Sequence, residues 1–426
     1  MKIRKIEVPA AEVIDGYAVY YVEVFITEYS WLVRKRYREF RELHDKLVKE
    51  YHIDQSLLPP KKYFGNLDPD YIETRRLLLE IYLHKLLEKF EDNLPDQLDN
   101  FLEGFKYDVC GVTYNLAKEL FETGDKILLD KQPYTFTPLQ LYCITKRLAL
   151  PVPTCDVHNI HAEIGNLYDF IQNLSHLKIV GKGQQFHLSD NVDFKYDLSL
   201  FKSLSNLEVS CIEMEAVQGL CQLLTQLKSL TVHQSAHLLK ARIPHTTWNL
   251  FTPIGTTNGS SYLTPNSNFH TWTDIRMADF SNNHFPYIDE SVSLLPNIES
   301  LNLSHNCIEE INHLESLSEL EVLDLSHNKL RAIPTNLNAK LGNIRKLNLA
   351  NNQLSCVDGL EKLYSLVELD LRSNLLTEVS SVVLIGDLPC LENLHLEGNP
   401  LTKESSYRVR VLSGFGERAR LVWYIA

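Results

Sequence analysis

The sequence lacks an excess of positive charge. Its 426 residues carry 42 lysines and arginines against 55 aspartates and glutamates, which gives a formal net charge of −13. A general basic surface for nucleic acid is therefore not expected. Any site for an anion must be a local cluster of cations.

Membrane spans and paired cysteines are also missing. No stretch reaches the roughly 18 uninterrupted apolar residues of a transmembrane helix, and the N-terminus has no apolar core of the kind found in signal peptides. The eight cysteines are scattered, without a CxxC pair or the Cys/His spacing of a structural zinc site. We therefore expect a cytosolic protein whose cysteines are mostly buried thiols, with no metal, no cofactor and only peripheral membrane contacts.

Motifs of common enzymes are absent as well. His158 and His161 lie in HNIHAEI, which is not HExxH, GKGQQF lacks the ending of a P-loop, and no GxSxG occurs. Isolated histidines and serines of this kind are much more often structural than catalytic. An enzyme is not expected.

The second half of the chain is periodic. Six segments fit the pattern L-x-x-L-x-L-x-x-N-x-L, the signature of leucine-rich repeats. Leucines at positions four and six predict short strands whose inward side chains form one continuous core. The asparagine is expected to cap the turn after each strand. It recurs in steps of 22 to 25 residues, at Asn283, Asn306, Asn328, Asn352, Asn374 and Asn399.

Weaker copies of the pattern come before these repeats. Residues 161–272 are predicted to hold degenerate repeats, with an exposed insertion at about 238–272, where a Thr/Asn/Ser/Pro-rich stretch is too long for one repeat. Regular repeats are expected over 273–402. Residues 403–426 break the pattern, as the terminal cap of an array does. The degenerate copies are at Leu174/Leu177/Ile179, Leu204/Leu207/Val209 and Leu227/Leu230/Val232.

One column of side chains lies between the two inward leucines of each strand and is expected on the concave face. Its three carboxylates favour a partner with basic character, although an ordinary solvated strand position explains any single residue equally well. The column consists of Asp279, Asn302, Asp324, Asn348, Asp370 and His395.

The first 110 residues have a different pattern. β-Branched and aromatic residues between Tyr17 and Val33 predict a small antiparallel sheet. Two amphipathic helices are expected after it, the second from about Pro69 to Phe90, separated by the proline-rich loop LLPPKKYFGNLDPD. Residues 111–160 are expected to form a helical connector.

Cations gather at three places in this N-terminal region. Arg36, Tyr37 and Arg38 follow the predicted sheet, Lys61 follows two prolines, and Arg75 lies near the start of the second helix. Guanidinium groups bind phosphate through paired hydrogen bonds, a lysine adds a point charge, and an aromatic ring packs on a sugar-like ring. Each residue alone is also typical of a solvated strand end, core packing or a turn. Their combination favours a site for a phosphorylated head group.

The segments RKRYREF, LPPKKYFG and ETRRLLLEIYLHKLL together resemble the three-part pattern of a Phox-homology (PX) domain, which residues 1–110 fit. The resemblance implies a phosphoinositide pocket, most often for phosphatidylinositol 3-phosphate. It also implies that Arg36 meets the 3-phosphate, that Tyr37 stacks on the inositol ring and that Arg38 supports them.

The same resemblance assigns the remaining site residues. Lys61, or its neighbour Lys62, corresponds to the lysine that meets the 1-phosphate, and Arg75 to the arginine that holds the free 4- and 5-hydroxyls. Tyr63 and Phe64 correspond to residues that insert into the membrane, although they are equally suited to covering the sheet.

A PX domain followed by leucine-rich repeats, with motifs such as LAKELFETG, KLGNIRKLNLA and LYSLVELDLRSN in this order, is similar to the nischarin family. The resemblance implies an α+β PX domain joined to an α/β repeat solenoid. It implies a cytoplasmic, endosome-associated scaffold that binds phosphatidylinositol 3-phosphate. Its repeats would engage an integrin tail, Rac or p21-activated kinase in cell migration. The alternative is a scaffold that binds proteins only, without functional lipid binding.

Overall fold

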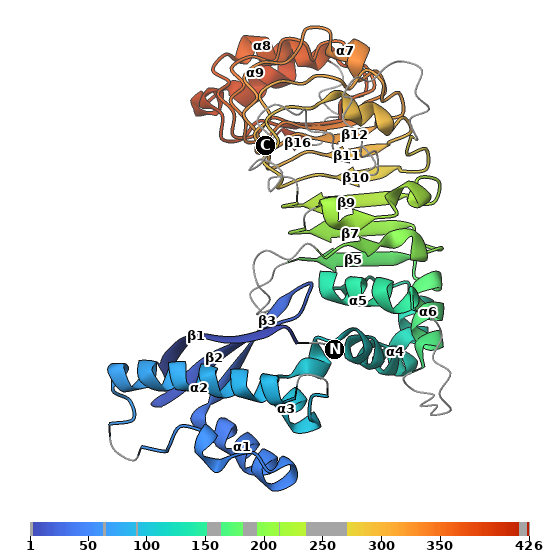
Figure 1. The fold of residues 1–426 in the computed structure, drawn as a ribbon. Coiled ribbons are helices and arrows are strands. Elements are labelled where there is room, and N and C mark those ends of the chain that lie inside the picture. Colours follow the sequence, from blue (N-terminus) through green and yellow to red (C-terminus); the bar gives the residue numbers. More distant parts are fainter. Residues whose placement is uncertain are drawn as a thin grey trace, which may run out of the picture. The chain divides into compact units, whose positions relative to one another are not determined.

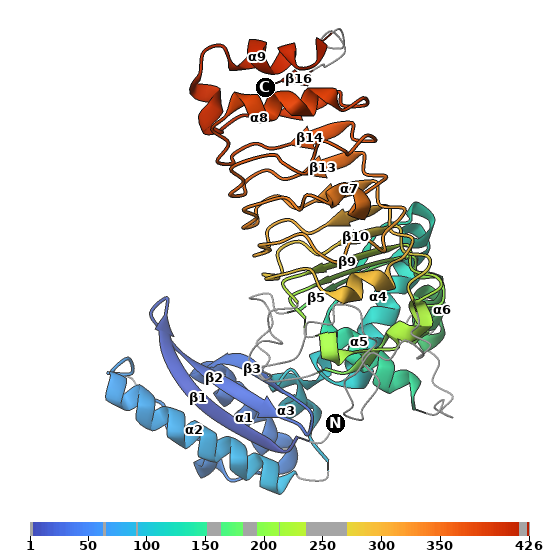
Figure 2. The same ribbon diagram turned by 90° about the horizontal axis from the view of Figure 1, so that it is seen from above.

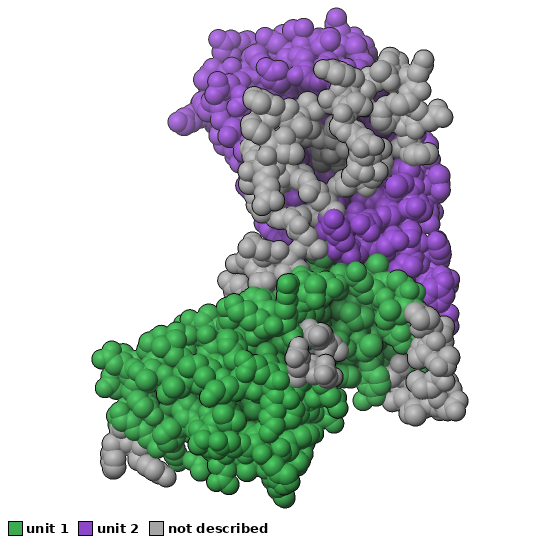
Figure 3. Space-filling model, in the orientation of Figure 1, with its two compact units in different colours: residues 1–123, 139–167, 182–194 green, residues 124–138, 168–181, 195–426 purple. Residues whose placement is uncertain are grey.

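The computed structural model describes residues 3–62, 65–90, 93–150, 163–181, 194–212, 214–235, 271–416 and 424–425 (Figures 1 and 2). The chain divides into two compact units. One comprises residues 1–123, 139–167 and 182–194, and the other residues 124–138, 168–181 and 195–426 (Figure 3).

The first unit begins with a three-stranded antiparallel sheet. Its strands are β1 (Lys5–Ile14), β2 (Tyr17–Phe25) and β3 (Ser30–Arg36), in the order β1-β2-β3. Asp15 and Gly16 connect β1 to β2, and both have positive φ, as a tight two-residue hairpin turn requires. The alternation along β2 turns Val22 and Val24 into the core. The small antiparallel sheet expected from the sequence is confirmed.

Helices cover one face of this sheet. α1 (Tyr37–Tyr51) begins directly where β3 ends, and it buries Phe40, Leu43 and Leu47. α2 (Pro69–Lys89) starts with a proline at its first position, where a missing N–H costs nothing. Shorter helices complete the region: η1 (Gln55–Leu57), α3 (Asp96–Phe101) and η2 (Gly104–Lys106).

The segment expected to be a helical connector contains helices and also a strand. α4 (Val109–Asp130) and α5 (Pro138–Leu148) flank β4 (Tyr134–Phe136). β4 pairs in parallel with β5 (His176–Val180), with Tyr134 opposite Leu177, and its Phe136 is fully buried. The repeat sheet thus extends into the predicted connector. A strand of three residues is too short to show a period in the sequence.

The second unit is built on a parallel sheet, which has 11 strands within the part of the chain that the structure describes. Neighbouring strands stack along its length (Figure 2), in the order β16-β15-β14-β13-β12-β11-β10-β9-β7-β5-β4. The remaining strands are β7 (Asn206–Ser210), β9 (Ser229–His233), β10 (Met277–Asp279), β11 (Ser300–Asn302), β12 (Val322–Asp324), β13 (Lys346–Asn348), β14 (Glu368–Asp370), β15 (Asn393–His395) and β16 (Tyr424–Ile425).

Short elements lie between some of the strands of the parallel sheet. β6 (Tyr196–Asp197) and β8 (Val217–Gln218) form a separate two-stranded sheet. The helices of this unit are α6 (Ile164–Asn173, which starts in the first unit), η4 (Leu198–Leu200), η5 (Met214–Ala216), η6 (Leu220–Leu223), η8 (Glu290–Leu294), α7 (Leu337–Lys340), α8 (Val379–Val383), η9 (Leu384–Asp387), η10 (Pro400–Lys403) and α9 (Tyr407–Ser413). Residues 236–270, which hold most of the expected insertion, lie outside the described residues.

The repeat asparagines act as the sequence predicts. Asn328 Nδ2 donates to the carbonyl oxygens of Leu303 at 2.9 Å and Leu325 at 3.0 Å. Its Oδ1 accepts from the backbone N–H of Ile308 at 3.0 Å. The side chain therefore joins two successive turns and satisfies backbone groups that are buried away from water. Asn306, Asn352, Asn374 and Asn399 repeat this pattern.

Candidate functional site

Arg75 is the centre of a polar cluster in the first unit. It lies on the second turn of α2 and is only 5% exposed. Its guanidinium carbon is 4.3 Å from the ring centre of Tyr37 and 4.4 Å from that of Tyr71. Nη2 also donates to the Tyr71 hydroxyl. Two aromatic rings therefore hold the cation through cation–π contacts.

The positions of these rings follow from the local fold. Tyr71 precedes Arg75 by one helical turn on α2, so both side chains lie on the same helix face. Tyr37 is the first residue of α1, directly after β3, and its hydroxyl donates to the Pro59 carbonyl oxygen at 2.5 Å. This bond ties the start of α1 to the loop that carries the two lysines. Burial raises the pKa of Tyr37, and the positive charges of Arg75 and Arg41 oppose that rise.

Arg75 is buried without a counter-ion. No carboxylate in the described ranges forms an ion pair with it, and its Nε has no hydrogen-bond partner. Arg76 differs, because it pairs with Glu73 at 2.7 Å and Glu80 at 3.6 Å and donates to the Val8 carbonyl oxygen. Burying an uncompensated charge is costly. Arg75 therefore has unused capacity for a ligand with oxygen acceptors, whereas Arg76 stabilises the fold.

Arg36 lies at the surface at the end of β3. Its guanidinium carbon is 4.4 Å from the ring centre of Tyr17, the first residue of β2. Its backbone N–H donates to the Glu39 carboxylate at 2.8 Å. The guanidinium group takes no part in this hydrogen bond. An exposed arginine beside an aromatic ring is able to bind an anion from solvent.

The side chain of Arg38 points into solvent. Its side chain is 88% exposed, and Nε lies 2.7 Å from the Glu42 carboxylate on the same helix. This is the ordinary i,i+4 pair of a solvated helix face. The structure therefore does not bring Arg38 to Arg75 or to Tyr71.

The two lysines of the proline loop also differ. Lys62 Nζ lies 4.1 Å from the ring centre of Tyr71, on the ring that also contacts Arg75. Lys61 is exposed in the same loop. Lys62 thus lies beside the cluster. Tyr63 and Phe64, the predicted membrane-inserting residues, lie outside the described residues.

Sequence reasoning missed two aromatic residues that contact the candidate cations. Tyr71 contacts both Lys62 and Arg75, and its one-turn spacing from Arg75 on a predicted helix was the signal that could have found it. Tyr17 contacts Arg36 across the sheet. That contact depends on the register in which β2 pairs with β3, which the sequence does not reveal.

The predicted partner-binding column lies along one line of the repeat sheet. Five of its six members accept a hydrogen bond from the backbone N–H two residues later, at 2.8–3.1 Å. Its carboxylates have further partners: Asp279 contacts His233, Asp324 accepts from Asn348, and Asp370 pairs with Arg372. The described column is thus engaged within the array.

Asp279 shows the electrostatic result of this engagement. Burial alone would raise its pKa, but hydrogen bonds from Ser281 and the contact with His233 outweigh burial, and the pKa lies below its usual value. Asp279 therefore stays ionised down to acidic pH.

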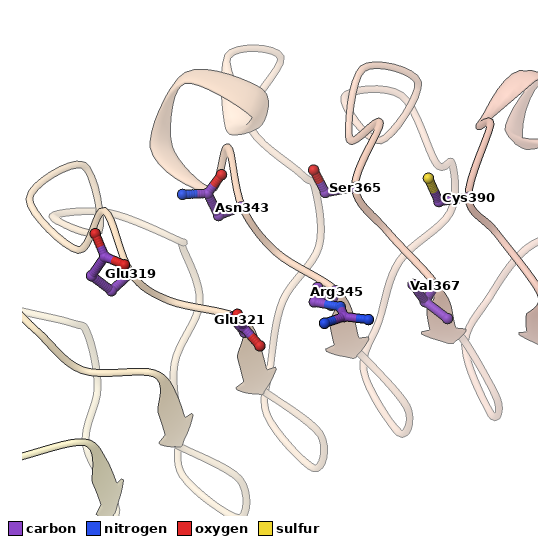
Figure 4. Close-up of a pocket in the computed structure, with 7 residues that line it drawn as sticks. All are labelled: Glu319, Glu321, Asn343, Arg345, Ser365, Val367 and Cys390. Atoms are coloured by element: carbon purple, nitrogen blue, oxygen red, sulfur yellow. The ribbon is translucent and has the colours of Figure 1, made fainter.

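A surface pocket of about 360 Å³ lies beside the starts of β12, β13 and β14. Figure 4 shows that its side chains come from successive repeats and stand next to one another, without converging on a point. Val367 is its one aliphatic side chain. The lining residues are Glu319, Glu321, Asn343, Arg345, Ser365, Val367 and Cys390.

A metal cluster and a membrane-spanning helix are both absent from the described part of the chain. It contains no group of three or more His, Cys, Asp or Glu side chains arranged to hold a metal ion. Among its helices, none combines the length and apolar character needed to cross a bilayer.

Comparison with protein families identifies a module in each of two parts of the chain. Residues 23–104 match the PX domain family. Residues 296–339, 318–362 and 342–383 match the family described as leucine-rich repeats in two copies. A PX domain, a module of the phosphoinositide-binding kind, is therefore followed by leucine-rich repeats, and neither module is catalytic. The predicted fold class is confirmed.

Curated relatives match parts of the chain. Serine/threonine-protein kinase 11-interacting protein of Gallus gallus is 28% identical over 71% of this chain and 28% of its own length. The Homo sapiens protein of that name is 32% identical over 52% of this chain and 19% of its own. Sorting nexin-16 of Homo sapiens is 32% identical over 25% of this chain and 37% of its own. The chain spans less than a third of the length of the first two relatives.

Solved structures also match parts of the chain. Internalin C2 of Listeria monocytogenes is 22% identical, covers 49% of this chain and 74% of its own, and has a TM-score of 0.34. A designed CISK-PX domain is 28% identical, covers 24% of this chain and 99% of its own, and has a TM-score of 0.22.

Proposed function

We propose that this chain is a phosphoinositide-binding scaffold whose PX domain binds phosphatidylinositol 3-phosphate and whose repeats hold a protein partner. The observation that carries the proposal is Arg75, buried between Tyr37 and Tyr71 without a counter-ion. A polyhydroxylated, phosphorylated ring would supply the acceptors that Arg75 lacks and a face of C–H groups on which an aromatic side chain can pack.

Each residue of the cluster then has a role. Arg36, exposed and next to Tyr37 in the chain, binds the 3-phosphate. Tyr37 packs on the inositol ring, Arg75 holds its 4- and 5-hydroxyls, and Lys62, with Lys61 beside it, binds the 1-phosphate. Arg38 contributes only a general positive potential, because Glu42 already pairs with it.

Membrane recruitment by this site is expected to be peripheral and weak. One head-group pocket, with Tyr63 and Phe64 as the proposed inserting residues, gives modest affinity, and a partner bound through the repeats would raise it by avidity. The proposed location is the cytoplasmic face of endosomal membranes, since these membranes carry phosphatidylinositol 3-phosphate.

The partner of the repeats is proposed from resemblance. Nischarin-like activity would make it an integrin tail, Rac or p21-activated kinase. The first two curated relatives are named for interaction with a serine/threonine protein kinase, so a protein kinase is a further partner class for this chain. The polar column from Asp279 to His395 is the proposed contact surface.

Co-sedimentation with vesicles tests the proposal. Phosphatidylcholine vesicles with and without phosphatidylinositol 3-phosphate are compared for wild type, Arg36→Ala and Arg38→Ala, after a melting curve shows that each is folded. We expect lipid-dependent pelleting of wild type, its loss in Arg36→Ala and its retention in the matched control Arg38→Ala. If folded wild type does not pellet, the alternative of a scaffold that binds proteins only replaces this proposal.

A further inference from the structure

Tyr20 is a buried residue of β2 to which the resemblance assigns no role. It is 0% exposed, on the inner face of the sheet and opposite Lys35 in β3. Its ring meets the edge of Phe40 on α1 at a centroid distance of 6.2 Å, which fixes the ring in place. The hydroxyl has no hydrogen-bond partner within the described part of the chain.

The Tyr20 hydroxyl belongs to the Arg75 cluster. Burial raises the pKa of Tyr20, and Arg75 opposes that rise through its charge and through a side-chain hydrogen-bond contact with the phenol, with Tyr71 and Tyr37 also close enough to act on the group. The Arg75 guanidinium lies close enough to the phenol to act on it as a donor, but the contact falls short of ordinary hydrogen-bond geometry, and the Tyr20 hydroxyl and Arg75 Nε keep unused capacity. Two buried polar groups with unused capacity therefore meet at one place.

Two such buried groups destabilise the fold unless hydrogen-bond partners are supplied to them. A buried polar group without a partner is rare and destabilising, and a phenylalanine would fill the same space without that cost. The presence of the hydroxyl here is explained if a bound ligand supplies its partner.

We infer that Tyr20 is a specificity-determining residue of the head-group site. Its hydroxyl forms a hydrogen bond with the free inositol hydroxyl that Arg75 holds. This inference rests on the proposed function, which it deepens by adding a residue that distinguishes singly from doubly phosphorylated head groups.

The chemistry of the phenol favours an alcohol over a phosphate at this position. A phenol and an alcohol each donate one hydrogen bond and accept others, so they satisfy one another in a closed space. A phosphate presents three acceptor oxygens and about two negative charges, and it requires several donors. With Tyr20 fully buried, an added phosphate would displace the phenol and leave acceptors unpaired. Sites built to bind a hydroxyl discriminate in this way.

The test compares Tyr20→Phe with Tyr21→Phe. Both substitutions remove one hydroxyl from β2, but the Tyr21 hydroxyl is exposed and donates to Glu12 at 2.8 Å on the opposite face. Affinity is measured by co-sedimentation with phosphatidylcholine vesicles that contain phosphatidylinositol 3-phosphate, 3,4-bisphosphate or 3,5-bisphosphate. A melting curve establishes that each variant is folded, and Phe preserves the packing of the ring.

We expect wild type and Tyr21→Phe to prefer the 3-phosphate to the same degree. In Tyr20→Phe the ratio of affinities for the 3-phosphate over the bisphosphates should fall by about five- to tenfold, the effect of one buried hydrogen bond. An unchanged ratio in Tyr20→Phe overturns the inference and leaves the proposed function standing. A folded wild type that binds none of the three lipids overturns the proposed function itself.

A second readout needs no variant. With ring-labelled tyrosine, the NMR signals of Tyr20 should shift when free inositol 1,3-bisphosphate is added to wild type. Signals of Tyr37 that shift while those of Tyr20 stay fixed would show head-group binding without the contact that we infer, and would overturn the inference.

Discussion

The guanidinium carbon of Arg75 lies 4.3 Å from the ring centre of Tyr37. This contact joins α2 to the residue at which β3 becomes α1, so one buried cation connects two segments that are distant in sequence. No described carboxylate balances Arg75, and this contact is the proposed position of an anionic or hydroxyl-rich ligand.

Replacing Arg75 separates binding from folding. Arg75→Met keeps most of the side-chain volume and removes a buried charge without a counter-ion. Such exchanges leave the free energy of unfolding unchanged or raise it by about 1–2 kcal/mol. Binding to vesicles with phosphatidylinositol 3-phosphate should fall more than about tenfold. Denaturant unfolding and co-sedimentation on the same preparation measure both.

Arg76→Met is the matched control, one residue along the same helix. Arg76 holds Glu73, Glu80 and the Val8 carbonyl oxygen, so its loss should lower the free energy of unfolding by about 1–2 kcal/mol. The vesicle affinity of the folded fraction should not change. If Arg76→Met lowered the vesicle affinity and Arg75→Met lowered the free energy of unfolding, the roles assigned to the two arginines would be wrong.

Tyr71 is predicted to support two cations. Tyr71→Ala removes the ring under Lys62 and Arg75, and cation–π contacts contribute about 0.5–2 kcal/mol each. We expect about a tenfold loss of vesicle affinity, measured by co-sedimentation. Lys62→Ala should weaken binding more than Lys61→Ala, and equal effects of the two lysines would argue against the role given to Lys62.

The repeat asparagine is predicted to act on stability alone. Asn328→Ala leaves the buried N–H of Ile308 and the carbonyl oxygen of Leu303 without partners, so the free energy of unfolding should fall by about 3–5 kcal/mol. The control is the exposed Asn336, which makes no capping bond. Asn336→Ala should change the free energy of unfolding by less than about 0.5 kcal/mol. Similar effects of both substitutions, measured by denaturant unfolding, would contradict the capping role.

The lowered pKa of Asp279 predicts how the stability of the repeats depends on pH. Its pKa in the folded state lies below the usual value of 3.8, so its contribution to stability is complete above the unfolded-state pKa and is lost as pH falls through the folded-state pKa. Wild type should therefore lose its advantage in melting temperature over Asp279→Asn as pH decreases from about 5 to about 3. An advantage that is constant over this range would show that the carboxylate charge does not stabilise the repeats.

The repeat architecture could be predicted because each repeat restates the same physical requirement. Leu301, Leu323 and Leu347 face one core at a fixed spacing, and Asn306 or Asn328 is required wherever a turn leaves buried carbonyl groups. Repetition supplies many independent observations of one pattern. The strand β4 repeats none of it and was therefore expected to belong to a connector.

The candidate site was only partly predictable. Tyr37 and Arg75 were found because their residue types suit a phosphorylated ring, but the sequence does not show which neighbouring cation turns inward. Pairing of Arg38 with Glu42 and of Arg76 with Glu73 depends on helix faces. Burial of the Tyr20 hydroxyl depends on the packing of α1 and α2 against the sheet, which no local pattern contains.

Calorimetric titration of free inositol 1,3-bisphosphate into the chain tests the central claim most directly, because it examines the head-group site without a membrane or a partner protein. The account predicts saturable binding of one head group per chain in wild type and none in folded Arg75→Met. Binding of equal strength in the two proteins, or no binding by folded wild type, would contradict it.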